Sequence, residues 1–190
     1  MVSFRVMKRR GVFKFMKEKL KKLFAYYAPY KPLFYSDMVF AVLGAAVTLM
    51  IPLIVRYITN EVVYFTPSEA KHTIMMLGVA LVGLVLVEIF CNFYIAYYGH
   101  VMGARMEADM RRDIFGHYQK LTFAFYDNQK VGHLLSRITS DLFDISELLH
   151  HGPEDLVISA IKIIGSFVIL MTVNVRLALI MFAFIPVMVI

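Results

Sequence analysis

A run of eighteen residues without a charge, Met38–Val55, constrains the fold of this chain more than any other feature. A helix that crosses the roughly 30 Å hydrocarbon core of a bilayer needs about 20 apolar residues. The run and its apolar flanks are therefore long enough to cross a membrane as one helix. We predict a first transmembrane span over residues 33–58.

The composition excludes the main alternatives to a membrane protein. Residues of the AVILMFWYC set make up 59% of the chain and charged residues only 18%, against ordinary globular contents of about 45–50% and about 25%. A soluble chain this short would need more polar surface to cover its core. Cys91 is the single cysteine, so it cannot form an internal disulfide and is most simply a buried small residue. We predict an all-α membrane protein.

Three more stretches have the length or pattern of membrane helices. Residues 73–99 form a second span whose helical pattern continues to residue 122, and residues 135–173 combine an amphipathic part with a third span. Residues 177–190 begin a fourth span after a very short turn at 174–176. These fourteen residues reach only about 21 Å as a helix. We therefore expect the chain to be part of a longer polypeptide.

The positive charge is concentrated in the first 32 residues, which hold ten basic residues and one acid, a net charge of +9. Apolar residues recur between the lysines at helical spacing, which predicts an amphipathic elbow helix over Phe13–Tyr30 that lies on the lipid surface. This pattern favours membrane lipid over nucleic acid as the partner. Basic residues beside the first span stay inside, so the N-terminus is expected in the cytoplasm.

Two apolar rows predict a helical hairpin that extends from the membrane into the cytoplasm. Polar and turn-forming residues interrupt the pattern within Phe123–Gly132, and the arms are about 30 Å long. Charges on the first arm suggest the i,i+4 pairs Arg105–Asp109 and Glu107–Arg111, and Pro153 is expected to kink or restart the second arm. The rows consist of Met102, Met106, Met110, Ile114 and Tyr118 on the first arm, and of Leu135, Ile138, Leu142, Ile145 and Leu149 on the second.

The sequence between the two arms carries a family resemblance. Residues 125–141 read FYDNQKVGHLLSRITSD and resemble the first intracellular loop of ATP-binding-cassette exporters, approximately F-[FY]-D-x-x-x-x-G-[DEQ]-[LIV]-[LIV]-S-R-[LIV]-[TS]-x-D. The basic elbow helix, the short turn before the fourth span and Pro186 within that span are similar to the family as well. His133 departs from the pattern, because an acid or amide usually stands there.

The resemblance implies that residues about 126–134 form a coupling helix, which docks on nucleotide-binding domains. Gly132 would permit the turn into the second arm, and Arg137 could pair with Asp141 on that arm. The residues that the resemblance assigns to this contact are Phe125, Tyr126, Asp127, Asn128, Gly132 and Arg137.

The same resemblance implies the membrane-spanning part of an ATP-driven half-transporter that exports a drug, lipid or peptide-like substrate by alternating access. ATP and Mg²⁺ would bind a C-terminal nucleotide-binding domain of the same polypeptide, and a second half-transporter would complete a homodimer or heterodimer in a bacterial cytoplasmic membrane. The 190 residues contain no G-x-x-x-x-G-K-[ST] phosphate loop. We therefore predict no catalytic residue in this chain.

The sequence leaves other readings open. A channel or receptor subunit whose hairpin recruits a partner is the main alternative, and a membrane-bound enzyme is a third, weakened by the lack of paired acid and base residues. His150 and His151 are adjacent, so they point about 100° apart on a helix and predict no metal site. Gly99 and Gly103 form a small-xxx-small pattern that permits close helix packing.

Two ionisable residues fall inside predicted spans, Glu88 and Lys162. Charges within a membrane usually face the bundle interior or water and mark a functional pathway. The two residues lie at similar depth, so they could form an interhelical ion pair, or Lys162 could reach the interface along its own stem. Alternatively, they line a substrate cavity together with Asn92, which lies one turn from Glu88.

Overall fold

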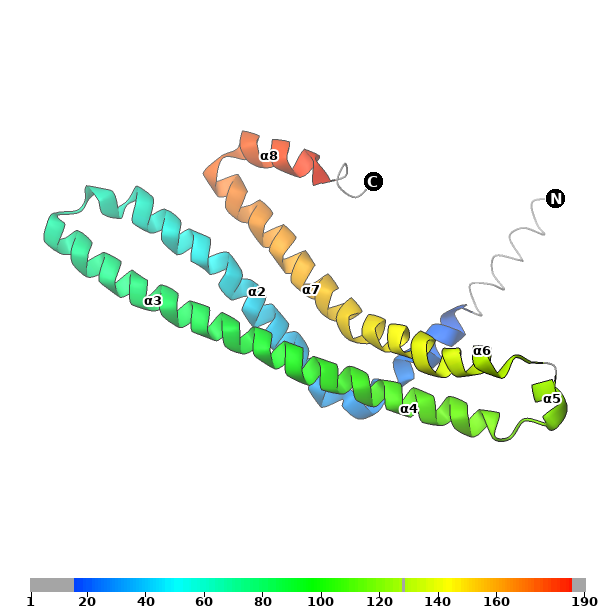
Figure 1. Cartoon of the computed structure of the whole chain (residues 1–190). Coiled ribbons are helices and arrows are strands. Elements are labelled where there is room, and N and C mark those ends of the chain that lie inside the picture. The colour runs from blue at the N-terminus through cyan, green and yellow to red at the C-terminus, as the bar shows by residue number, and fades with distance from the viewer. Residues whose placement is uncertain (1–15, 128, 186–190) are drawn as a thin grey trace, which may run out of the picture. The chain divides into compact units, whose positions relative to one another are not determined.

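The computed structural model describes residues 16–127 and 129–185, and these residues form helices with short connections and no strand. This confirms the all-α class. After a first helix over residues 16–25, the elements in Figure 1 are η1 (Ala28–Tyr30), α2 (Lys31–Asn60), η2 (Val62–Tyr64), α3 (Pro67–Tyr94), the π-helical turn η3 (Ile95–Gly99), α4 (His100–Tyr118), α5 (Phe123–Asp127), α6 (Val131–Ser136), the π-helical turn η4 (Arg137–Asp141), α7 (Leu142–Val173) and α8 (Val175–Ala183).

Three helical stretches among the described residues are long and apolar enough to cross a membrane, Ala28–Tyr64, Pro67–Tyr118 and Val131–Val173. Each contains one of the first three predicted spans. The start of the predicted fourth span is helix α8, while Pro186 lies outside the described residues.

The chain divides into two compact units, which we describe separately. The hairpin unit consists of the residues up to Tyr35 together with Gly99–His150, and the span unit consists of Ser36–Tyr98 together with residues from His151 onward.

In the span unit, α2 and α3 run side by side in opposite directions (Figure 1). The rings of Phe40 and Tyr94 lie with their centroids 4.0 Å apart, and a Cβ added to Gly44 would be 3.4 Å from the Cβ of Cys91. Cys91 is fully buried, as predicted. Small residues thus let these two helices approach closely, as is common between membrane helices.

The helices that follow the two connections of the span unit begin at residues whose side chains suit a helix start. The backbone N–H of Thr66 donates to Glu69 Oε2 at 3.2 Å at the start of α3, which is half of a capping box. Asn174 alone separates α7 from α8, and its Oδ1 accepts the backbone N–H of Leu177 at 3.1 Å. This cap confirms the predicted short turn between these helices.

The core of the hairpin unit is the methionine row of α4. Met102, Met106 and Met110 are buried, as the periodicity predicted. They form one cluster with residues of the returning arm and of the N-terminal segment, namely Tyr27, Ile138, Leu142 and Leu149.

For one residue of the predicted apolar row on the second arm, Leu135, the expected burial was wrong. Leu135 is 60% exposed, whereas its neighbour Leu134 is only 7% exposed and takes the inward position. The π-helical turn η4 follows directly and holds more residues per turn than an α-helix. The inward positions at the start of the second arm are therefore Leu134, Ile138 and Leu142.

The N-terminal segment is held on α4 by tyrosine hydroxyls. Tyr26 donates to Asp113 Oδ2 at 2.9 Å, and Tyr30 donates to Asp109 Oδ2 at 2.7 Å. Partial burial and the hydrogen bond to Asp113 raise the pKa of Tyr26. The helix over residues 16–25 lies within the predicted elbow, whose start at Phe13 falls outside the described residues.

The charges along α4 pair only partly as the sequence predicted. Arg111 forms an ion pair with Glu107, which confirms that prediction. Asp109 instead pairs with Arg112, at 3.2 Å from Nη1. The predicted Arg105–Asp109 pair was therefore wrong, because the Asp109 carboxylate is already shared by Arg112 and Tyr30.

Pro153 lies inside α7 and does not end it. A proline has no backbone N–H, so it leaves the carbonyl of the residue four positions earlier without its helical donor. That residue is Leu149, and its carbonyl oxygen accepts a hydrogen bond from the hydroxyl of Tyr27. The predicted restart of the helix at Pro153 was therefore wrong, and the N-terminal segment supplies the missing donor.

Candidate functional site

The end of the hairpin is built from two short helices, α5 and α6, that follow α4. The Tyr126 hydroxyl of α5 donates to the backbone carbonyl of Tyr118, at the end of α4, at 2.5 Å. The Phe125 and Tyr126 rings meet edge to face with centroids 5.3 Å apart. These contacts fold α5 back onto the end of α4 and fix the shape of the hairpin end.

An apolar pocket of about 230 Å³ lies between the arms next to this hairpin end. Aromatic and aliphatic side chains form most of its wall, and it offers few polar atoms for binding a polar ligand. Its lining residues come from α4, α5, α6 and η4 and are Phe115, Tyr118, Gln119, Tyr126, Val131, Leu134, Leu135 and Ile138.

Large apolar side chains are exposed around the pocket. Phe123, the first residue of α5, is 90% exposed, and Val131, the first residue of α6, is 63% exposed. An exposed apolar patch on a protein surface marks a place of contact with another protein or with a membrane. The exposure of Phe123 could not be predicted from the sequence, because a phenylalanine next to a turn gives no signal of its own exposure.

The structure places the other predicted contact residues around this hairpin end. Phe125 and Tyr126 are half-buried, whereas Asp127 and Arg137 are exposed. Gly132 lies in α6 rather than in the turn, and among the described residues no glycine has a positive φ. Arg137 forms no ion pair with Asp141 in the described part of the chain, so the pair that their four-residue spacing allowed does not form. Asn128 lies outside the described residues.

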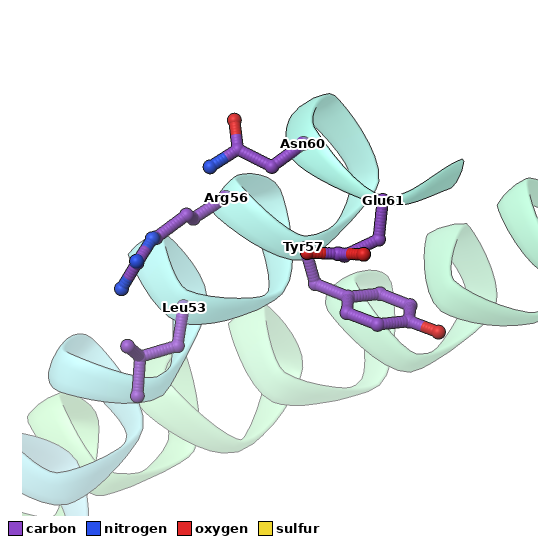
Figure 2. Close-up of a pocket in the computed structure, with 5 residues that line it drawn as sticks. All are labelled: Leu53, Arg56, Tyr57, Asn60 and Glu61. Atoms are coloured by element: carbon purple, nitrogen blue, oxygen red, sulfur yellow. The ribbon is translucent and has the colours of Figure 1, made fainter. Parts of the chain in front are cut away.

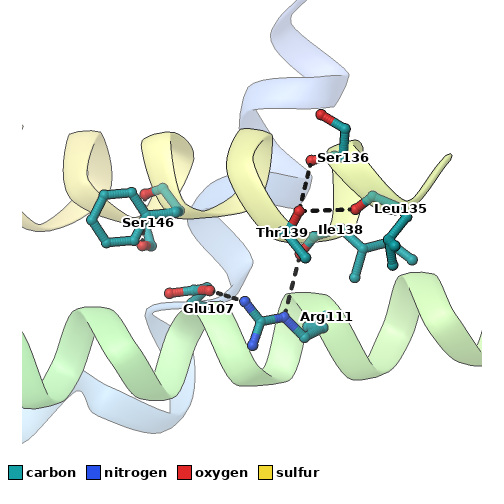
Figure 3. Close-up of polar contacts among 8 residues, drawn as sticks. Glu107, Arg111, Leu135, Ser136, Ile138, Thr139 and Ser146 are labelled. Carbon is teal, nitrogen blue, oxygen red and sulfur yellow. Dashed lines mark hydrogen bonds and ion pairs between the residues drawn. The ribbon is translucent and has the colours of Figure 1, made fainter. Parts of the chain in front are cut away.

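The π-helical turn η4 is braced by Arg111 of α4 (Figure 3). The Nε of Arg111 donates to the backbone carbonyl of Ile138 at 3.3 Å, while its Nη2 pairs with Glu107. The Thr139 hydroxyl of η4 also donates to the carbonyl of Leu135 in α6 at 3.1 Å. A π turn disturbs the regular i→i−4 hydrogen-bond ladder, and these side-chain donors satisfy carbonyls at that point.

Replacing Arg111 by methionine should weaken the hairpin by about 1 kcal/mol, because the carbonyl of buried Ile138 loses a charged donor. The matched control is Arg112→Met on the same helix. The exposed ion pair between Arg112 and Asp109 contributes about 0–1 kcal/mol to the free energy of unfolding. We expect a lower midpoint of thermal unfolding for the Arg111 variant than for the Arg112 variant. Equal midpoints for the two variants would contradict the bracing role of Arg111.

The polar residues of the predicted spans do not pair as expected. Glu88 Oε1 accepts a hydrogen bond from the hydroxyl of Thr48 on α2 at 2.8 Å. No ion pair joins Glu88 to Lys162 among residues 16–127 and 129–185, so of the alternatives for these two residues the interhelical pair does not form. Lys162 and Asn92 are exposed in this chain, and Glu88 is half-buried.

A second pocket, of about 240 Å³, lies at the end of α2 (Figure 2). The Arg56 and Glu61 side chains provide its charges. The lining holds a single acid and no histidine or cysteine, so it has neither a paired acid and base nor a set of metal ligands. The remaining lining residues are Leu53, Tyr57 and Asn60.

Long apolar helices joined by a helical hairpin define an α-helical membrane domain. Comparison with known families gives the same result. The chain matches the ABC transporter transmembrane region over residues 34–190. It therefore belongs to the ABC transporter transmembrane family.

Curated bacterial proteins are similar to this chain over most of its length. An uncharacterized ABC transporter ATP-binding protein, YwjA of Bacillus subtilis (strain 168), is 38% identical over 170 residues, which cover 90% of this chain and 29% of that protein. A putative multidrug export ATP-binding/permease protein of Staphylococcus aureus (strain NCTC 8325) is 24% identical over 164 residues, covering 84% and 28%. The chain thus spans less than a third of the length of these relatives.

Proposed function

We propose that this chain is the N-terminal, membrane-spanning part of an ATP-driven exporter, and that the end of its hairpin transmits the movement of nucleotide-binding domains to the membrane helices. The observation that carries the proposal is the exposed apolar surface of α5 and α6, in a chain that matches an ABC transporter transmembrane region. The name of the Staphylococcus aureus relative, which combines export, ATP-binding and permease, supports it.

The hairpin end is suited to transmitting force. The Tyr126–Tyr118 hydrogen bond and the bracing of η4 by Arg111 tie the end of the hairpin to its arms. Phe123 and Val131 remain exposed for a partner. A displacement of α5 would therefore be passed to α4 and to η4 rather than absorbed by a loose loop.

ATP and Mg²⁺ would bind the part of the polypeptide that lies beyond this chain, because the 190 residues lack a phosphate-binding loop. In that arrangement this chain supplies no atom to hydrolysis. Its hairpin positions the nucleotide-binding domain, and its membrane helices supply one wall of the pathway. A second half-transporter, identical or different, supplies the opposite wall.

The proposed orientation places the N-terminus and the hairpin in the cytoplasm of a bacterial cell. The net charge of +9 in the first 32 residues supports it, because basic residues flanking a span favour the inner side. The substrate, a drug, lipid or peptide-like molecule, would cross between the spans. Glu88, Asn92 and Lys162 remain the candidate cavity residues, and the exposure of Asn92 and Lys162 in this chain leaves both side chains open to other helices or to substrate.

Replacing Phe123 by aspartate in the full-length protein tests the coupling role. Placing a carboxylate in an apolar contact removes an anchor worth about 2 kcal/mol or more, so we expect at least about a tenfold loss of substrate-stimulated ATPase activity and of transport. Basal ATPase activity should persist, because the nucleotide site itself is intact. Both activities can be measured in proteoliposomes.

Phe143→Asp is the matched control, since Phe143 on α7 is also an exposed phenylalanine of the hairpin unit but lies outside α5 and α6. The control should keep substrate stimulation. A cysteine at position 123, in a Cys91→Ala background, should also crosslink to the nucleotide-binding domain through a cysteine-to-lysine reagent. Full stimulation in Phe123→Asp together with no such crosslink would overturn the proposal.

A further inference from the structure

The pocket at the end of α2 is small and is lined by one positive and one negative side chain. It measures about 240 Å³, which is below the roughly 300–1,000 Å³ of pockets for drug-sized ligands. The pocket therefore suits a small polar group rather than a whole drug-sized substrate. Its lining residues recur at positions i, i+3, i+4, i+7 and i+8, which form one face of a helix, and are Leu53, Arg56, Tyr57, Asn60 and Glu61.

The position of this pocket along the span matches the depth of the lipid headgroups. The uncharged run of residues 38–55 rises about 27 Å as a helix, close to the roughly 30 Å of a hydrocarbon core. Arg56 is the first charged residue after this run, and Tyr57 and Tyr64 nearby are exposed. Tyrosines at the end of a span are typical of the membrane–water interface. The Arg56 guanidinium is thus placed where phospholipid phosphates lie, whichever way the chain crosses the membrane.

The two charges of the pocket do not neutralise each other. Within residues 16–127 and 129–185, the charged groups of Arg56 and Glu61 take part in no ion pair or hydrogen bond. Figure 2 shows their charged ends apart from each other. Both side chains are exposed, so each can reach a ligand without breaking a contact within the chain. A ligand that complements both charges carries a negative and a positive group, and is therefore a zwitterion.

We propose that this pocket binds the headgroup of a phospholipid that carries a phosphate and a primary ammonium group, as phosphatidylethanolamine does. The Arg56 guanidinium donates to the phosphate, for which its planar set of N–H groups is well suited. Glu61 accepts from the ammonium, which also lies over the Tyr57 ring. A quaternary ammonium has no N–H to donate to Glu61, and a purely anionic headgroup is repelled by it. The inference needs the membrane position of α2 but not the proposed export function.

Lipid binding to the full-length protein tests the pocket. Native mass spectrometry of the detergent-purified protein counts bound lipids during titrations with phosphatidylethanolamine, phosphatidylcholine or phosphatidylglycerol. We expect Arg56→Gln to weaken the tightest phosphatidylethanolamine site by about tenfold, because a hydrogen bond between charged groups is lost. Arg176→Gln is the matched control, since Arg176 is an exposed arginine near the start of α8 that does not line the pocket. This control should bind phosphatidylethanolamine as the unaltered protein does.

A second variant, Glu61→Gln, should change the lipid preference in a way that a damaged fold would not. It removes both the acceptor for the ammonium and the repulsion of an anion. Phosphatidylethanolamine affinity should therefore fall by about tenfold, while phosphatidylglycerol affinity should rise. Equal affinity of the unaltered protein for phosphatidylethanolamine and phosphatidylcholine, or unchanged phosphatidylethanolamine binding in Arg56→Gln, would overturn the proposal. Displacement of the lipid by an equal concentration of free phosphoethanolamine would overturn it too, because the ligand would then be a soluble molecule.

Discussion

Gly99→Ala should destabilise the protein by about 1–3 kcal/mol, the cost of overpacking a well-packed site. A Cβ at this position would lie 2.0 Å from Cε1 and 2.9 Å from Nδ1 of the His150 ring. His150 is buried, and its ring meets His100 edge to face with centroids 5.0 Å apart. The ring therefore has little room to move aside, and we expect a lower midpoint of thermal unfolding in the full-length protein.

Gly116→Ala on α4 is the matched control, because an added Cβ meets no atom within 4 Å there. Removing a glycine from a helix interior should leave stability unchanged or raise it by up to about 1 kcal/mol. The double variant Gly99→Ala with His150→Ala tests whether the loss of stability comes from the clash of the added methyl group with the His150 ring or from a change in the backbone at position 99. If His150→Ala does not reduce the cost of the added methyl group, the contact with the ring is not the cause.

Tyr27→Phe should cost about 1–3 kcal/mol, because it leaves the buried carbonyl of Leu149 without any donor. The helical donor for that carbonyl is absent, since the residue four positions later is Pro153. We expect lower thermal stability and faster proteolysis of the N-terminal segment. Tyr26→Phe is the control, since its hydroxyl bonds Asp113 at an exposed site and its loss should cost less.

The Tyr27 interaction also has a defined dependence on pH. Burial raises the pKa of Tyr27 from its ordinary value of 10.0 to about 12. The folded protein therefore holds the phenolic proton more tightly than the unfolded chain does. The stabilisation is complete below pH 10.0 and is lost as the pH rises to about 12, and Tyr27→Phe should remove this dependence. An unchanged alkaline unfolding profile in the variant would contradict the role of Tyr27.

The helices and much of the hairpin core follow from sequence periodicity. Met102, Met106 and Met110 repeat every fourth residue and are buried together, because one apolar row on a charged helix has only one face to cover. The membrane class followed from the uncharged run Met38–Val55 and the apolar composition. The Glu107–Arg111 pair was predictable for a similar reason, since residues four apart on a helix are neighbours.

The remaining features depend on contacts between segments far apart in sequence. No local sequence pattern predicts a π-helical turn. The burial of Leu134 in place of Leu135 could therefore not be predicted. The hydrogen bond from Tyr27 to Leu149 joins residues 122 positions apart. Asp37 on α2 and Glu154 on α7 each look like ordinary charges in the sequence, and only the packing of the two helices brings their carboxylates within 4.8 Å of each other.

The connection between α7 and α8 is a single residue, Asn174, whose side chain caps the start of α8. A linker this short has no spare length, so neither helix can slide along its axis without carrying the other with it. A movement of the end of α7 would therefore be passed directly to the start of α8. The two π-helical turns, η3 and η4, differ from this link, because the regular hydrogen-bond ladder is interrupted there inside a continuous helical stretch and such interruptions are common places for a helix to bend.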